Sequence, residues 1–108
     1  MPVINIGDTV VLRNKAGEPL GELTVQECRH GAWCGTFAPA SGYARVRGLF
    51  VEWTELVNDQ CFSLVDALEE KISTIGISAF RGSEHLPVSH VQIYDEGDQI
   101  EGSFRLVA

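Results

Sequence analysis

The 108-residue sequence is 44% hydrophobic and 21% charged, which is typical of one folded domain with a core of its own. Fifteen acidic residues against eight basic ones give a formal net charge of −7, and this charge opposes binding to nucleic acid or to anionic lipid. No stretch approaches the roughly 18 apolar residues of a membrane span and the start lacks the features of a signal peptide, so we expect residues 1–108 to form one cytoplasmic domain.

The first forty residues favour β-structure. Two segments rich in β-forming residues, 9–13 and 23–28, flank a cluster of turn residues at 14–19. A third strand is expected near 32–37, and the proline-containing segment 38–42 should end it. These segments predict an N-terminal hairpin followed by a third strand.

The middle of the chain has the periodicity of an amphipathic helix. Its apolar residues recur every three or four positions, namely at Val46, Phe50, Trp53, Val57, Cys61, Leu64, Leu68, Ile72 and Ile75. The pattern fits one long helix over 43–75, or two helices broken near 58–60 with Ser63 and Asp66 capping the second. On one straight helix Phe62 would point into water, whereas a break would let it turn inward, and this favours the break.

The last third returns to β-structure, with strands expected at 77–80, 88–94 and 100–107 and turns at 81–84 and 95–99. Strands, helix and strands in this order predict an α+β domain. We expect a curved antiparallel sheet of about five to six strands, formed by the N-terminal hairpin, the third strand and a C-terminal three-stranded meander. The central helix, kinked or broken, should pack on one face. The expected core comprises Val10, Leu12, Val25, Phe37, Phe50, Trp53, Val57, Leu64, Leu68, Ile72, Ile77, Val91, Ile93, Phe104 and Leu106.

Three cysteines invite two chemical interpretations. Cys28, His30 and Cys34, joined by Cys61 or His90 through folding, could form a tetrahedral zinc site, although no Cys-x-x-Cys pair is present. A cysteine nucleophile would need electropositive surroundings, which the acidic neighbours of Cys61 do not provide. Reduced cysteines packed as small apolar residues explain the pattern better, so we assign no metal ligand, cofactor or catalytic residue.

The C-terminal hairpin predicts one polar face. If Val91 and Ile93 point inward, the alternation of a strand points His90, Gln92 and Tyr94 outward. The partner strand should add three more polar side chains on that face, Glu101, Ser103 and Arg105. Such a face is often simply solvated, but its mixture of acid, base, hydroxyl and imidazole makes His90, Gln92, Tyr94 and Arg105 candidate binding residues.

The helical segment predicts a second candidate surface, which is acidic. Its carboxylates lie largely off the apolar stripe, at Glu52, Glu55, Asp59, Asp66, Glu69 and Glu70. They could solvate the helix or bind a basic partner, and we take Glu52, Glu55 and Glu69 as candidate binding residues. No calcium-binding loop motif accompanies them.

These patterns support two hypotheses about function. The leading one is a non-enzymatic interaction module or accessory subunit that presents an acidic surface to a basic protein partner, because the chain is small, acidic and without a catalytic motif. Self-association is included, because the terminal strands leave sheet edges that could pair between copies. The alternative is a small-molecule-binding protein or small enzyme with a pocket between sheet and helix. Its lining would come from His30, Trp33, Tyr43, His90, Tyr94 and Arg105.

Overall fold

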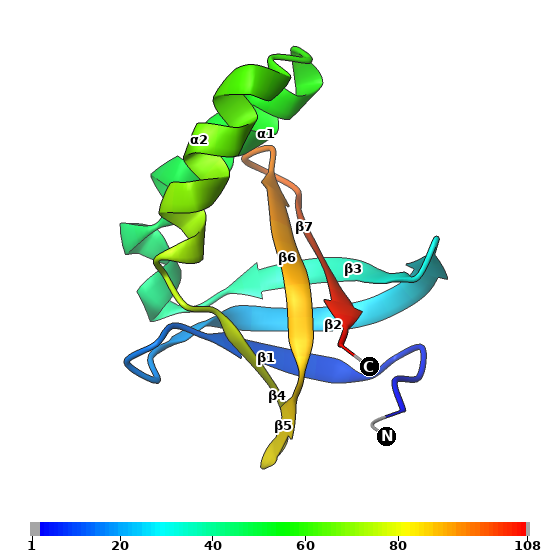
Figure 1. Cartoon of the computed structure of the whole chain (residues 1–108). Coiled ribbons are helices and arrows are strands. Elements are labelled where there is room, and N and C mark those ends of the chain that lie inside the picture. Colours follow the sequence, from blue (N-terminus) through cyan, green and yellow to red (C-terminus); the bar gives the residue numbers. More distant parts are fainter. Residues whose placement is uncertain (1–2, 108) are drawn as a thin grey trace.

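The computed structural model describes residues 3–107, which form a curled antiparallel sheet and a helical hairpin (Figure 1). The seven strands of this part of the chain are β1 (Thr9–Arg13), β2 (Pro19–Arg29), β3 (Ala32–Pro39), β4 (Ser78–Arg81), β5 (Glu84–Leu86), β6 (Val88–Asp95) and β7 (Ile100–Leu106). Between β3 and β4 lie the 3-10 helix η1 (Ser41–Arg45) and the α-helices α1 (Arg47–Asn58) and α2 (Phe62–Ser73). The α+β class and the antiparallel sheet are therefore confirmed.

The strand order β5-β4-β1-β2-β3-β7-β6 explains why the sheet curls. Its two outermost strands, β5 and β6, are consecutive in the chain and only Pro87 separates them. This bent segment pairs first with β4 and then with β7, so the sheet closes into a half-barrel in which β6 crosses over β1–β3 (Figure 1). The prediction of five to six strands missed β5. The predicted C-terminal meander is also wrong in one connection, because β4 pairs with β1.

The core fills the inside of the curled sheet and the underside of α1. Of the predicted core residues ten are buried, namely Val10, Leu12, Val25, Phe37, Phe50, Trp53, Leu68, Ile72, Ile93 and Phe104, while Val57, Ile77, Val91 and Leu106 are half-buried around them. Among residues 3–107, the prediction missed eight further buried hydrophobic residues: Ile4, Leu20, Leu23, Tyr43, Val65, Ile75, Ala79 and Leu86. No helix of the described residues is long and apolar enough to cross a membrane.

A Schellman motif breaks the central helix where the sequence predicted a break. Gln60 adopts a left-handed conformation with φ of 58°. The N–H of Cys61 donates to the carbonyl of Leu56 at 2.9 Å, and the N–H of Gln60 donates to the carbonyl of Val57 at 3.1 Å. These two bonds satisfy carbonyls at the end of α1 and reverse the chain. The result is two helices in a hairpin, and not one kinked helix lying across the sheet.

The expectations for α2 need correction. The helix begins at Phe62 and Cys61 makes no side-chain capping bond, so Ser63 lies inside the first turn and is not the cap. The buried face of α2 is formed by Val65, Leu68 and Ile72. Leu64, predicted in the core, and Phe62, predicted to turn inward, are both exposed. Only α1 packs extensively on the sheet, while α2 packs mainly on α1. The buried face of α2 is therefore narrow, and Phe62 and Leu64 lie outside it.

Candidate functional site

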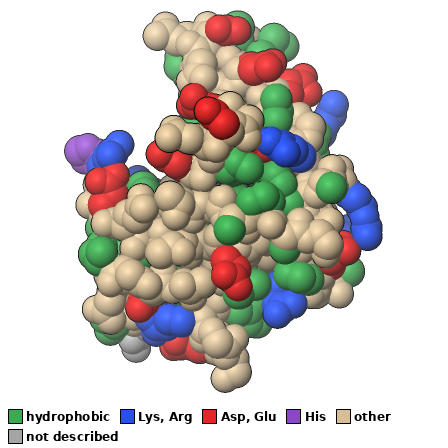
Figure 2. All heavy atoms as spheres, turned by 180° about the vertical axis from the view of Figure 1, so that it is seen from behind, with side chains coloured by type: hydrophobic (Ala, Val, Ile, Leu, Met, Phe, Trp, Pro, Cys, Tyr) green, Lys and Arg blue, Asp and Glu red, His purple; other side chains and the backbone are tan. Residues whose placement is uncertain are grey.

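The outer surface of the helical hairpin is acidic. Six carboxylates are exposed on α1, the interhelical turn and α2: Glu52, Glu55, Asp59, Asp66, Glu69 and Glu70. Figure 2 shows acidic side chains gathered over the upper part of the molecule, where Figure 1 places the hairpin. Among residues 3–107, none of the six forms an ion pair. Arg45 pairs with Glu18 at 3.0 Å and Arg47 with Asp95 at 2.9 Å. The six carboxylates then outnumber Lys71, the other basic residue of the two helices, so the surface is negatively charged.

Two large apolar side chains stand beside this charge. Phe62 is 61% exposed and Leu64 is 57% exposed, both in the first turn of α2 next to Asp59 and the interhelical turn. Aromatic and aliphatic side chains at the centre of an interface often provide much of the binding energy. The tip of the hairpin thus combines apolar anchors with unpaired carboxylates.

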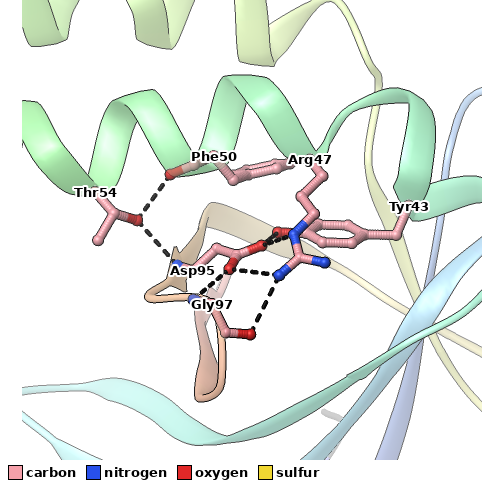
Figure 3. A network of polar contacts seen from close by, with 6 residues as sticks. All are labelled: Tyr43, Arg47, Phe50, Thr54, Asp95 and Gly97. Atoms are coloured by element: carbon pink, nitrogen blue, oxygen red, sulfur yellow. Dashed lines mark hydrogen bonds and ion pairs between the residues drawn. The ribbon is translucent and has the colours of Figure 1, made fainter.

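A buried polar network attaches the base of the hairpin to the sheet (Figure 3). The side chain of Asp95, at the end of β6, is fully buried. Its carboxylate accepts hydrogen bonds from the hydroxyl of Tyr43 at 2.8 Å, from the N–H of Gly97 at 2.9 Å and from the Nη2 of Arg47 at 3.3 Å. The Nε of Arg47 also lies 2.9 Å from the carboxylate in an ion pair. The N–H of Asp95 donates to the hydroxyl of Thr54 at 2.9 Å. The network therefore fixes η1 and α1 against the β6–β7 turn.

The electrostatics of this network follow from its burial and its donors. Burial by itself would raise the pKa of Asp95, but the N–H of Gly97, the Tyr43 hydroxyl and Arg47 together outweigh it and hold that pKa below its usual value. Burial raises the pKa of Tyr43 far above its usual value, and the neighbouring carboxylate adds to this effect. Asp95 is thus ionised and Tyr43 is neutral, and every buried side-chain polar atom of the described residues is hydrogen-bonded. These properties identify the network as structural support.

The polar face of the C-terminal hairpin borders a hollow of about 530 Å³, which is lined by residues of β2, β3, β6 and β7 and by Asn58 at the end of α1. The structure brings Gln92, Tyr94 and Arg105 to this hollow together with His30 and Cys34. Burial raises the pKa of Tyr94 and of the Cys34 thiol. Both groups are consequently protonated at neutral pH, and Cys34 is a poor nucleophile.

His90 lies apart from that hollow because of a β-bulge. The register of β6 against β7 shifts between Ser89 and Gln92, and His90 has a φ of 53°. The extra residue in β6 re-aims the side chain. His90 instead borders a groove of about 390 Å³ between β6 and α2, whose lining also includes Ile72, Ile77 and Val88.

The six residues suggested for a small-molecule pocket do not converge on one cavity. His30, Tyr94 and Arg105 line the hollow and His90 lines the groove. Tyr43 is buried in the Asp95 network, and Trp33 borders neither depression. Within residues 3–107, no three His, Cys, Asp or Glu side chains are arranged to hold a metal ion, and all three cysteines are unpaired.

Sequence reasoning missed the groove and the Asp95 network. The groove is lined by residues of α1, α2, the α2–β4 connection and β6. Nothing within any one of these segments indicates that the four come together. The sequence predicts that Asp95 lies in the hairpin turn 95–99, and nothing local links it to Tyr43, which lies 52 positions away. The position of Phe62 opposite the apolar stripe favours a break in the helix and indicates neither of these two features.

Comparison with known proteins finds no family model, curated protein or solved structure that matches this chain.

Proposed function

We propose that this chain is a non-enzymatic interaction module that binds a basic protein partner through its helical hairpin. One observation carries the proposal: the helical hairpin exposes six carboxylates that form no ion pair among residues 3–107, and the exposed side chains of Phe62 and Leu64 stand at its tip. Phe62 and Leu64 provide apolar area for a partner to bury. The carboxylates select a partner with positive charge and repel acidic competitors.

The Asp95 network supports this role mechanically. It holds α1 to the β6–β7 turn through Tyr43, Arg47 and Thr54, so the hairpin projects from the sheet as a preordered element. A binding surface that is already ordered loses less conformational entropy on association. The sheet then serves as the platform, and the hairpin serves as the contact surface.

The apolar anchors give the first prediction. Replacing Phe62 and Leu64 with serine should abolish stoichiometric capture of the partner in a tagged pull-down from native lysate, quantified by mass spectrometry. Two hot-spot side chains together carry about 3–5 kcal/mol of binding energy, a loss of more than 100-fold in affinity. The unfolding midpoint should remain unchanged because both side chains are exposed.

The matched control replaces Ile6 and Val107, which are exposed on other parts of the molecule, with serine. This variant should capture the partner as the wild type does. Equal capture by the Phe62/Leu64 variant and by the wild type would contradict the proposed role of the hairpin tip.

A further inference from the structure

The hollow on β2, β3, β6 and β7 exists because small side chains meet on neighbouring strands. Ser103 of β7 pairs with Cys34 of β3 on one side and with Gln92 of β6 on the other. Side chains of directly paired residues lie on the same face of a sheet, so Ser103 and Cys34 form a low floor. Ala32, the next residue of β3 on that face, extends this floor. Longer side chains stand around it and enclose the hollow of about 530 Å³.

The hydroxyl of Ser103 lies at the bottom of the hollow without a hydrogen-bond partner. Ser103 is only 8% exposed and lines the hollow, yet its Oγ bonds to no other group of residues 3–107. Because no fully buried side-chain polar atom in this part of the chain lacks a partner, the Oγ of Ser103 must still reach the space of the hollow. An enclosed hydroxyl without a partner is a position where a ligand can donate or accept a hydrogen bond.

The rim of the hollow carries opposite charges at its two ends. The end beside the β2–β3 turn is basic, with Arg29, His30 and Arg105. The end beside the β6–β7 turn is acidic, with Glu96 and Glu101. The hollow is therefore polarised along β7, which runs from the acidic end to the basic one.

One charge at each end is available to a ligand. Arg29 pairs with Glu27, which also borders the hollow, so these two charges offset each other. Arg105 and Glu101 form no ion pair among the residues that the structure describes. The guanidinium of Arg105 lies against the β2–β3 turn, where a Cβ on Gly31 would be 2.8 Å from its Nη1. Arg105 and Glu101 thus mark the two ends of a polar site.

The spacing of Glu101 and Arg105 sets the length of a ligand that reaches both. The two residues are four positions apart on β7, which separates their Cα atoms by about 13 Å and keeps them on one face. An extended tripeptide spans roughly 10 Å, and the two long side chains can cover the difference. An anion would be opposed by Glu101 and by the net charge of −7, and a cation would be opposed by Arg105. A zwitterion matches both ends.

We propose that this hollow binds a small zwitterion of about tripeptide length, with its carboxylate at Arg105 and its ammonium at Glu101. The hydroxyl of Ser103, halfway between these residues on β7, would bond to the central peptide group of the ligand, and the side-chain amide of Gln92 would add a second bond. A few polar groups placed in this way fix the orientation of a ligand. The inference goes beyond the proposed function, because the hollow does not include the tip of the helical hairpin.

The test titrates triglycine with free termini into the isotope-labelled full chain and follows the backbone amide signals by NMR. We expect the signals of Cys34, Gln92 and Ser103 to shift and to saturate with a Kd of about 1 mM or below. Acetyl-triglycine lacks the ammonium and triglycinamide lacks the carboxylate. Each should bind at least about fivefold more weakly than triglycine, because one charged contact is lost.

Single substitutions locate the two ends of the ligand. Arg105→Gln and Glu101→Gln should each weaken binding of triglycine by about fivefold or more, and Ser103→Ala by about threefold or more. Arg105→Gln should also remove the preference for triglycine over triglycinamide, which a general loss of structure would not do. The matched controls are Lys71→Gln and Glu70→Gln, at exposed charges of α2 outside the hollow, and both should bind as the wild type does.

The outcomes separate this inference from the proposed function. A Glu52→Lys/Glu55→Lys variant, altered on the hairpin surface alone, should bind triglycine like the wild type even though it no longer captures the protein partner. No shift at about 20 mM triglycine, well above the expected Kd, would overturn the zwitterion site. Equal binding of the two blocked peptides, or shifts confined to residues outside the hollow, would overturn it as well, and each of these results leaves the hairpin proposal standing.

Discussion

Replacing Asp95 with alanine is expected to lower the free energy of unfolding by about 3 kcal/mol, measured by denaturant titration. The substitution leaves the buried hydroxyl of Tyr43 without its acceptor and removes the counter-charge of Arg47. It also frees the N–H of Gly97. Because Arg47 is partly exposed and can be solvated, the loss should stay below that of a fully buried pair.

The lowered pKa of Asp95 also leads us to expect a loss of stability in acid. The pKa of Asp95 is lower in the folded protein than its ordinary value of about 3.9. Its contribution is therefore fully present above the unfolded pKa and is lost as pH falls through the folded pKa. The difference in unfolding free energy between the wild type and Asp95→Asn should be constant above about pH 5 and should shrink at lower pH.

A matched control uses the same turn. Asp98 is exposed and forms no ion pair among the described residues, so Asp98→Asn should change the unfolding free energy by less than about 0.5 kcal/mol. If Asp95→Ala were as mild as Asp98→Asn, the network of Figure 3 would not anchor the hairpin.

Replacing Gly35 with alanine is expected to lower the free energy of unfolding by about 4 kcal/mol or more, a large part of the roughly 5–15 kcal/mol that stabilises an ordinary domain. β3 passes so close to β2 at this point that a Cβ on Gly35 would lie 1.7 Å from the carbonyl oxygen of Thr24 and 3.1 Å from the Cα of Val25. Both contacts are backbone atoms of a paired strand, so relief requires the two strands to separate. Circular dichroism and the yield of soluble protein measure the effect.

Gly48 provides the matched control for this substitution. It lies in α1, and a Cβ there would meet no atom within 4 Å. Gly48→Ala should therefore raise the unfolding free energy by about 0.5–1 kcal/mol, because alanine is the better helix former. A Gly35→Ala variant as stable as the wild type would contradict the close approach of β2 and β3.

The local elements of this fold could be predicted from the sequence because their signals are local. The β-forming segments 9–13 and 32–37 and the turn at 14–19 became strands and a turn near the expected positions. The helix break near 58–60 was likewise anticipated. Turn residues, β-branched runs and helical spacing all act within a few positions of one another.

The connections between elements could not be predicted in the same way. The sequence predicts no strand directly before Pro87. In the structure this residue separates β5 from β6, the two strands of the bent segment that closes the sheet. The bulge at His90 changes which side chains share a face, and it depends on pairing with β7. Leu64 and Val65 have similar hydrophobicity, so only the packing of α2 on α1 decides that Leu64 is exposed and Val65 is buried.

The candidate sites depend on the same distant contacts. Gln92, Tyr94 and Arg105 could be grouped from strand alternation alone, and the structure places them along one hollow. His90 could not be separated from them without knowledge of the bulge. The acidic residues Glu52, Glu55 and Glu69 are evident in the sequence, but only the structure shows that they form no ion pair among residues 3–107.

The most direct measurement of the proposed function is the amount of partner captured from native lysate as salt is raised, for the wild type and for Glu52→Lys/Glu55→Lys. An equal charge change at exposed acids outside the hairpin, Glu22→Lys/Asp98→Lys, is the control. We expect wild-type and control capture to be stoichiometric at low salt and to fall as salt screens the charges, and we expect the hairpin variant to capture no partner at any salt concentration. Two results would contradict binding of a basic partner through the hairpin. One is that the wild type captures no partner at low salt, and the other is that all three proteins capture the same amount of partner regardless of salt.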